Sequence, residues 1–307
     1  MLKRTSGSKI RQPMDLPTGR RAGQVLSTLG QLARPRLLAM VLLTLVVAHV
    51  VAGDEWPRWG SVAQATFGSA LLIVGAMALN QRLEGRSDGL MVRTAGRPLP
   101  AGLLSSRSVT LFGLTASLSG LFYLGVFVRF DALLVGVVSW LLYVWIYTPL
   151  KALTPWQTPV GAVAGAMPVL LGAAAAGHVA SPIALSLFGI VFFWQFPHAM
   201  AIAWLYRGQL AEAQTKVASV VDPSGWLPAV VAVGGSLALL PVSLMPVWIG
   251  QAGWLYGLAA LTLGLLYLAA SFRFLWCRDE GRARQLLKAS FLYLPVLAIA
   301  LLATVRL

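Results

Sequence analysis

The sequence predicts an all-α, polytopic membrane protein, and three observations support this class. The 307 residues are 58% hydrophobic and only 11% charged, whereas globular domains carry about 25% charged residues. Apolar runs of about 20 residues recur along the chain, each long enough to cross the hydrocarbon core of a bilayer as a helix. These runs are continuously apolar and do not alternate, which excludes a transmembrane β-barrel. A soluble single-domain enzyme is excluded as well.

Nine apolar stretches between charged or Pro/Gly breaks are predicted to form a helical bundle that spans the bilayer. In chain order they are residues 37–52, 61–80, 108–128, 132–148, 158–177, 182–205, 227–248, 252–272 and 287–305. Residues 1–36 are polar and basic, so we expect a flexible cytoplasmic tail near anionic headgroups, followed by a membrane domain over 37–307. No apolar core follows Lys3 and Arg4, so we expect no cleavable signal peptide.

The distribution of basic residues predicts the orientation of the bundle. Of the 24 lysines and arginines, 21 lie in the N-terminal tail or after even-numbered spans, and only Arg58, Arg129 and Arg306 lie on the other side. Basic residues accumulate on the cytoplasmic side, so we expect a cytoplasmic N-terminus and an inner-membrane location. The net charge of +14 then reflects topology, and no nucleic-acid partner is expected. The single cysteine, Cys277, excludes an internal disulfide.

The two larger polar loops, 81–107 and 206–226, follow the second and the sixth spans, and this offset indicates two related halves with a site between them. The first loop opens with Asn80-x3-Glu84-x3-Asp88, a spacing that aligns three oxygen ligands along one stripe of a continued helix. Such ligands suit Mg²⁺, which completes its shell with water and substrate phosphate. The alternative is a solvated, charged helix end.

Basic side chains near these oxygens could bind the same phosphate. Arg93 and Arg97 follow in the first loop and could form bidentate hydrogen bonds. Lys151 is the only basic residue after the fourth span, and Tyr147 lies one helical turn before it. The alternative for all three basic residues is a role as anchors at the membrane surface.

The fifth and sixth spans carry features of two kinds. Gly161 and Gly165 are four residues apart and Pro168 follows, which indicates close helix packing and a kink, a structural role. His198 lies near Trp194 in the sixth span, and a histidine inside an apolar span is a functional candidate. It could ligate haem iron, transfer a proton or hydrogen-bond a neighbouring helix, and the residues alone leave these three open.

The motifs that are absent narrow the enzyme classes. The sequence has no Walker loop, dinucleotide-binding glycines, nucleophile elbow or Cys/His metal spacing. Most spans also lack the mid-membrane charge expected of a proton-coupled transporter. The best remaining enzyme hypothesis is chemistry on a metal-bound phosphate at the cytoplasmic mouth.

The stretch from Asn80 to Gly102 resembles the first acidic motif of the UbiA superfamily of intramembrane prenyltransferases, most closely in the branch of the haem O synthases. Further matches extend over about residues 30–307: Arg34-Pro35-Arg36, Tyr147-Thr148-x2-Lys151, Thr154-Pro155, Gly161 to Gly177, Trp194-x2-Pro197-His198 and Ala283 to Leu294. The branch is favoured by His198 and the run Arg97-Pro98-Leu99-Pro100.

The resemblance implies a nine-helix bundle with a central cavity open to the cytoplasm and the membrane. Its members in this branch transfer farnesyl from farnesyl diphosphate to a vinyl group of haem B, with addition of water, and release haem O and diphosphate. The residue roles carried over are Mg²⁺ binding by Asn80, Glu84 and Asp88, with Glu212 as a further candidate ligand; binding of the diphosphate by Arg93, Arg97, Lys151, Tyr147 and Lys216; and acceptor binding by His198 and Trp194.

The chain departs from the family after the sixth span. There the haem branch commonly reads Asp-Tyr-x2-Ala-Gly-x-Pro, whereas this chain has Gln209 for the Asp, Gln214 for the Gly and Lys216 for the Pro. Glu212 offers a carboxylate one turn after Gln209. A second Mg²⁺ site is therefore in question.

This departure keeps two alternatives open beside haem farnesylation. One is a UbiA-type prenyltransferase with another acceptor, such as a quinone precursor or a tetrapyrrole. The other is a non-catalytic paralogue that binds haem or isoprenoid lipid. Besides the two substrates and the lipid bilayer, the partners considered are downstream haem-modifying or oxidase-assembly proteins. Retention of the complete first motif places catalysis ahead.

Overall fold

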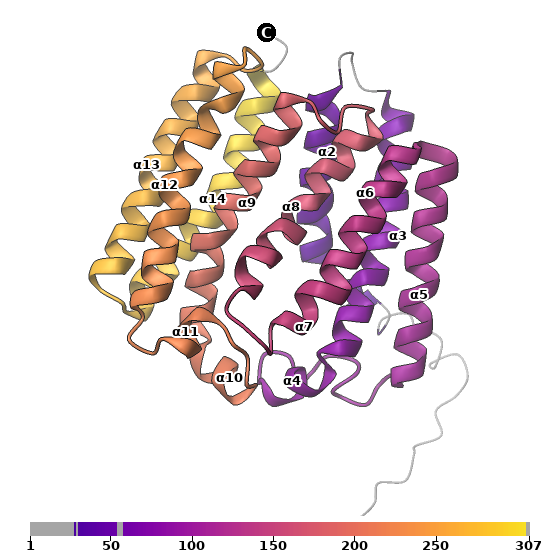
Figure 1. The fold of residues 1–307 in the computed structure, drawn as a ribbon, viewed down its shortest axis with the longest axis vertical. Coiled ribbons are helices and arrows are strands. Elements are labelled where there is room, and N and C mark those ends of the chain that lie inside the picture. Colours follow the sequence, from indigo (N-terminus) through magenta and orange to yellow (C-terminus); the bar gives the residue numbers. More distant parts are fainter. Residues whose placement is uncertain (1–27, 29, 54–57, 305–307) are drawn as a thin grey trace, which may run out of the picture.

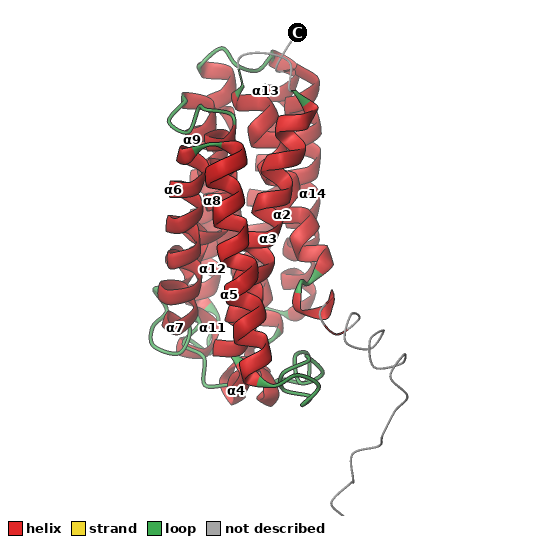
Figure 2. Ribbon diagram, turned by 90° about the vertical axis from the view of Figure 1, so that its right-hand side faces the viewer, coloured by secondary structure: helices red, strands yellow, loops and turns green. Residues whose placement is uncertain are grey.

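The computed structural model describes residues 28, 30–53 and 58–304 of the chain. Within this part, nine helices are long and apolar enough to cross a membrane, and they run side by side (Figures 1 and 2). Their bounds are α2 Pro35–Ala52, α3 Trp59–Leu83, α5 Ser106–Tyr123 with the π-helical η1 Leu124–Val128, α6 Phe130–Leu141 with η2 Leu142–Tyr147 and α7 Thr148–Leu150, α8 Gln157–Ala175, α9 Pro182–Leu205, α12 Trp226–Trp248, α13 Trp254–Trp276 and α14 Glu280–Thr304. The predicted nine-span helical bundle is confirmed.

The boundaries differ from the prediction at both ends of the domain. Helix α14 begins at Glu280, before the expected start at 287, because the polar segment there is amphipathic: Ala283 and Leu286 are buried against the core, while Arg284 and Gln285 between them are exposed. Before α2, Leu32 is fully buried and its carbonyl accepts a hydrogen bond from Gln81 Nε2. The last residues of the expected tail are therefore part of the folded domain, while residues 1–27 lie outside the described residues.

The short helices gather at one end of the bundle, here called the mouth end (Figure 1). Helix α4, Gly85–Leu90, belongs to the first mouth loop, residues 84–105. Helices α10, Arg207–Glu212, and α11, Ala218–Val221, belong to the second mouth loop, residues 206–225. These loops follow the second and the sixth spans, so the fold brings together the two loops that the sequence singled out.

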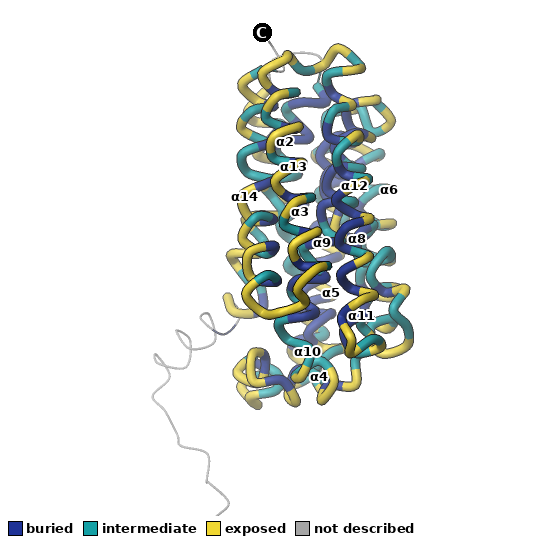
Figure 3. Tube along the Cα trace, turned by 90° about the vertical axis from the view of Figure 1, so that its left-hand side faces the viewer, coloured by how far each residue is buried: buried dark blue, intermediate teal, exposed yellow. Residues whose placement is uncertain are grey.

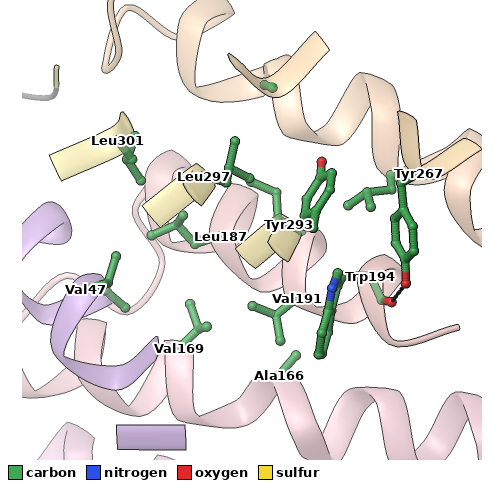
Figure 4. Close-up of a cluster of buried hydrophobic side chains, with 14 of the residues drawn as sticks. Val47, Ala166, Val169, Leu187, Val191, Trp194, Tyr267, Tyr293, Leu297 and Leu301 are labelled. Carbon is green, nitrogen blue, oxygen red and sulfur yellow. Dashed lines mark hydrogen bonds between the residues drawn. The ribbon is translucent and has the colours of Figure 1, made fainter. Parts of the chain in front are cut away.

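The two largest buried clusters among the described residues connect most of the helices. The larger one joins α2, α8, α9, α12, α13 and α14, and Figure 4 shows part of it around Val191 and Leu297. The other joins α2, α3, α6, η1 and α8. Helices α2 and α8 contribute to both clusters and so connect the two sides of the bundle. At their crossing, Gly172 lies against the Leu45 carbonyl with no room for a side chain, the close approach that small residues permit in membranes.

The outer surface of the bundle is apolar. Large side chains such as Leu118, Phe122 and Leu266 are more than 60% exposed on the outer helix faces, and Figure 3 shows exposed residues along the outside of the helices with buried residues toward the inside. Lipid tails are the natural solvent for such a surface. The chain is therefore a multi-pass membrane protein.

Candidate active site at the mouth end

A cavity of about 580 Å³ opens at the mouth end. Its wall comes from the first mouth loop, the α7–α8 connection, the last turns of α9 and the second mouth loop. Among the described residues it is lined by four basic side chains, Arg34, Arg93, Arg97 and Lys151, and by two carboxylates, Glu84 and Asp88. This excess of positive charge suits an anionic ligand.

The two carboxylates lie where helix α3 gives way to α4. Glu84 caps the end of α3 and starts the next helix, so the chain nearly continues as a helix, as the spacing of the motif predicts. Glu84 Oε1 pairs with Lys151 Nζ at 2.7 Å, and Asp88 pairs with Arg97 at 2.5 Å. Each carboxylate is thus paired with a cation, Glu84 with Lys151 of the α7–α8 connection and Asp88 with Arg97 of the first mouth loop. This pairing offsets the cost of holding charge in a partly desolvated site.

Asn80 occupies a different position from the carboxylates. It is fully buried and lies outside the cavity lining, and its Nδ2 donates to Thr148 Oγ1 at 3.0 Å. Helical backbone hydrogen bonds link Asn80, Glu84 and Asp88, but only the two carboxylates line the cavity. Asn80 Oδ1 is buried and has no hydrogen-bond partner among the described residues. Most buried polar atoms do have such a partner, so this oxygen is a candidate for ligand binding.

Lys151 is held from two sides. Its Nζ lies 4.5 Å from the centre of the Tyr147 ring, on the same wall of the cavity. Burial alone lowers the pKa of Lys151, but neighbouring Tyr147 and Glu84 outweigh it and raise the pKa above its ordinary value. Gly161 on α8 lets the Tyr147 ring pack where a larger side chain would overlap it. The predicted close packing at Gly161 thus also positions Tyr147 and, through it, Lys151, both of which line the cavity.

The sequence assigned no chemical role to Arg34, although this residue lines the cavity. Its Nη2 atom is buried without a partner among the described residues. Burial, and after it the nearby Arg34 charge, lowers the pKa of Arg97. The sequence position of Arg34 could have indicated this role, because Arg34 directly precedes the first span, on the same side of the membrane as the two loops.

His198 also lines the cavity, whereas Trp194 lies behind it. The Trp194 and His198 rings stack with their centres 4.7 Å apart. His198 Nδ1 lies 2.8 Å from Ser290 Oγ on α14, and Trp194 Nε1 donates to the Ser290 carbonyl at 2.9 Å. The hydrogen bond to a neighbouring helix, one of the three readings of His198, is therefore present.

The second mouth loop contributes no charge to the cavity wall. Glu212 and Lys216 are exposed and lie outside the lining. Gln209 Oε1 accepts a hydrogen bond from the backbone of Arg93 at 3.3 Å, and the Lys216 backbone donates to the Lys151 carbonyl at 2.8 Å. The departure from the family motif thus coincides with a neutral contact between the two loops.

The donor set fits a single Mg²⁺ that shares a phosphate ligand. Among the described residues, no group of three or more His, Cys, Asp or Glu could hold a metal ion by itself. Two carboxylates in the wall and the unpaired Asn80 oxygen are, however, the type of partial set that Mg²⁺ uses when substrate phosphate and water complete its shell.

The fold and the cavity define a class: a polytopic helical membrane protein with a site for a phosphorylated ligand at the membrane surface. The model of the UbiA prenyltransferase family matches residues 41–294. The chain belongs to this family of prenyltransferases. A relative from Rhodopirellula baltica, named protoheme IX farnesyltransferase, is 36% identical over 284 residues, which cover 90% of this chain and 98% of the relative.

Solved structures confirm the UbiA fold. One, of digeranylgeranylglyceryl phosphate synthase in membranes, has a TM-score of 0.78 at 14% identity and covers 92% of this chain and 99% of its own. Another, a UbiA homologue from Archaeoglobus fulgidus bound to DMAPP and Mg²⁺, has a TM-score of 0.56 at 16% identity, and the match covers 90% of this chain and 99% of the homologue.

Proposed function

We propose that this chain transfers farnesyl from farnesyl diphosphate to a vinyl group of haem B, which yields haem O and diphosphate. The observation that carries the proposal is the cavity at the mouth end, where two carboxylates and four cations meet beside His198. Similarity over nearly the full length to protoheme IX farnesyltransferases supports haem as the acceptor. The UbiA homologue that binds DMAPP and Mg²⁺ supports a metal-bound isoprenyl diphosphate as the donor.

The reaction needs no protein nucleophile. The bond between C1 of farnesyl and the diphosphate oxygen breaks, and diphosphate leaves with both electrons. C1 then bonds to the terminal vinyl carbon of haem B, and water adds a hydroxyl to the inner vinyl carbon with release of a proton. Stabilising the negative charge that develops on the leaving oxygens is the main task of the protein, and fixed cations do this best where water is excluded.

Basic side chains of the wall perform that task in the proposed mechanism. Arg93, Arg97 and Lys151 bind the diphosphate oxygens, and Tyr147 keeps Lys151 in place. The raised pKa of Lys151 keeps its amine charged at neutral pH. Arg34, with its unpaired guanidinium nitrogen, adds a fourth cation. Arg97 and Lys151 are already paired with Asp88 and Glu84, so ligand binding exchanges the partners of these two cations.

Glu84, Asp88 and Asn80 would hold the Mg²⁺. Bound there, the ion would neutralise diphosphate charge and act as a Lewis acid on the leaving group. Two buried acceptors of this set, Asn80 Oδ1 and Glu84 Oε1, have no hydrogen bond among the described residues. Glu84 Oε1 lies in the ion pair with Lys151, whereas Asn80 Oδ1 has no partner among these residues, which makes it available to the metal or its water. We leave Glu212 and Lys216 out of the proposed site because both are exposed and lie outside the cavity lining. Asn80 is buried and donates to Thr148, which lines the cavity.

His198 and Trp194 are the proposed acceptor-binding residues. His198, on α9, lines the cavity, and the Trp194 ring stacks on its ring. An imidazole is a common ligand of haem iron. Placing the iron at His198 brings a flat porphyrin into the same cavity as the diphosphate.

The proposed orientation puts the mouth end in the cytoplasm, with the chain in the inner membrane. Both mouth loops and the α13–α14 turn lie on this side and carry most basic residues of the described loops. The membrane domain begins before residue 37, because Thr28 and Leu32 are already buried. Farnesyl diphosphate can reach such a site from the cytoplasm while its chain remains in lipid.

Mass spectrometry tests the function. Purified protein in lipid nanodiscs is incubated with Mg²⁺, haem B and farnesyl diphosphate, with a second arm that contains EDTA and a third that lacks haem. The expected product is hydroxyethylfarnesyl haem in the first arm alone. Folded protein that makes no such product, beside an active relative as control, contradicts haem farnesylation and redirects the search to another acceptor or to a binding role.

A further inference from the structure

The environment of His198 determines which ring nitrogen carries the proton. Ser290 lies on α14 and is fully buried, facing the imidazole. Its Oγ lies 2.8 Å from His198 Nδ1 and 2.6 Å from the carbonyl oxygen of Leu287. A serine hydroxyl has a single proton to donate. A carbonyl can only accept, so the hydroxyl proton belongs to the bond with Leu287, and Ser290 Oγ accepts from His198.

This assignment leaves Nε2 of a neutral imidazole without a proton. In the neutral ring one nitrogen donates and the other carries a lone pair. With Nδ1–H directed at Ser290, the lone pair is on Nε2. No described group of the protein forms a hydrogen bond with Nε2, and the residue lines the cavity. The ring thus donates to the protein interior on one edge and offers an acceptor to the cavity on the other.

Aromatic neighbours hold the ring in this orientation. Trp194 stacks on one face with an interplanar angle of 19°, and Phe291 approaches edge-on with ring centres 5.4 Å apart. Trp194 is itself fixed, because its Nε1 donates to the Ser290 carbonyl and its own carbonyl accepts from the Tyr267 hydroxyl at 3.2 Å (Figure 4). Three helices, α9, α13 and α14, therefore define the position of one imidazole.

We propose that Ser290 is a positioning residue that holds His198 as its Nδ1–H tautomer, so that the Nε2 lone pair binds the iron of a haem acceptor in the cavity. The choice of ligand rests on the proposed function, whereas the tautomer does not. A metal-binding histidine typically donates its other N–H to a fixed acceptor, and removal of that acceptor weakens metal binding by about 10- to 100-fold. Ser290 supplies this acceptor from a different helix.

Nuclear magnetic resonance of ¹⁵N-histidine-labelled protein in bilayers tests the tautomer without any ligand. The chain has three histidines, and the His198→Asn variant assigns the signal. We expect a neutral ring with Nδ1 protonated and Nε2 unprotonated, and a mixture of tautomers in Ser290→Ala. A wild-type His198 with its proton on Nε2 overturns the proposal.

Titration with ferric haem, followed through the Soret band, tests the consequence. Ser290→Ala should bind haem about 10- to 100-fold more weakly, with an unchanged KM for farnesyl diphosphate. Ser271→Ala is the matched control, because it also removes a fully buried serine hydroxyl. Ser271 lies on α13, where its hydroxyl donates to the Tyr267 carbonyl of the same helix and also bonds to Ser236. The control variant should leave the haem affinity within about twofold of wild type.

The outcomes separate this inference from the proposed function. Equal haem affinity in wild type and Ser290→Ala, in protein that farnesylates haem, overturns the role of Ser290 alone. Wild-type protein that shows the Nδ1–H tautomer but no haem binding in the Soret titration keeps the positioning role of Ser290 and contradicts the choice of iron as the ligand of His198.

Discussion

The two mouth loops occupy corresponding places in the chain, yet they present different chemistry to the cavity. The first, residues 84–105, directs two carboxylates and two arginines into the wall. The second, residues 206–225, contributes only Leu210, Ala213, Thr215 and Val217, and none of its charged side chains lines the cavity. Equal position after a span therefore does not imply equal function, and the charge for a diphosphate comes from one side of the bundle.

The second mouth loop instead contacts the residues that line the cavity. Gln209 accepts a hydrogen bond from the Arg93 backbone, and the Arg93 guanidinium lies 4.8 Å from the centre of the Tyr206 ring. The backbone of Lys216 bonds to the carbonyl of Lys151. These contacts join the two loops at the mouth of the cavity. Substitutions in the first mouth loop should thus reduce the rate of the chemical step, and substitutions in the second mouth loop should change substrate binding or stability.

The largest effect is expected from the carboxylates of the first loop. The double substitution Glu84→Gln, Asp88→Asn removes two metal ligands while keeping their shape, and it should reduce Mg²⁺-dependent turnover by about 10³-fold. Glu212→Gln in the second loop is the matched control and should stay within about twofold of wild type. Product formation is followed by mass spectrometry, with circular dichroism to verify folding. Comparable losses in both variants would refute the asymmetry between the loops.

A methyl group at Gly161 should have the next largest effect. It would overlap the Tyr147 ring and shift the wall that carries Lys151, and a displacement of about 1 Å in a site can cost up to about 100-fold in rate. We expect a 10- to 100-fold loss of kcat on this basis. Gly208→Ala in the second loop, where nothing lies within 4 Å, is the control. Normal turnover of Gly161→Ala would show that Tyr147 and Lys151 need not be held in place.

Loss of the contact between the loops should change binding more than chemistry. Gln209→Ala removes an exposed hydrogen bond of 3.3 Å to Arg93, so we expect the KM for farnesyl diphosphate to rise by about threefold with kcat unchanged. Gln251→Ala, an exposed glutamine between α12 and α13, is the control. A fall in kcat equal to that of the carboxylate variant would mean that Gln209 acts in the chemical step.

The smallest effect concerns stability. Gln214 has a φ of 55°, in the left-handed region that glycine adopts more readily. Gln214→Gly should therefore stabilise the protein by about 0.5 to 1 kcal/mol, whereas Gln285→Gly inside α14 should destabilise it by a similar amount. Thermal unfolding in detergent measures both. A lower unfolding midpoint for Gln214→Gly would show that the glutamine side chain stabilises the second loop.

The sequence predicted the spans and the first mouth loop because their signals are local. Hydropathy marks each helix, and basic residues mark one side of the membrane. The family resemblance placed Lys151, which follows the fourth span, in one site with Glu84 and Asp88, which follow the second span, and the structure pairs Glu84 with Lys151. The glycine expected at Gln214 also has a physical reason, because the backbone there has a positive φ.

The rest depends on contacts between helices, which no single stretch of sequence reveals. Asn80 turns toward Thr148, 68 residues away, and Ser290 meets His198 across 92 residues. The exposure of Glu212 results from the way α10 lies on the bundle, since helical spacing alone allows either face. Arg34 joins the cavity because the segment before α2 packs beside Gln81.

The most direct test of the asymmetric site is the position of the metal. Crystals or lipidic-phase samples with Mn²⁺ in place of Mg²⁺ and farnesyl thiodiphosphate as a slowly reacting donor would locate the ion by its anomalous scattering. A single peak bound by Glu84 and Asp88, with Arg97 and Lys151 turned from these carboxylates to the diphosphate, is the predicted result. A peak at Glu212 or Gln209, or an unbroken Glu84–Lys151 pair beside the bound diphosphate, would contradict it.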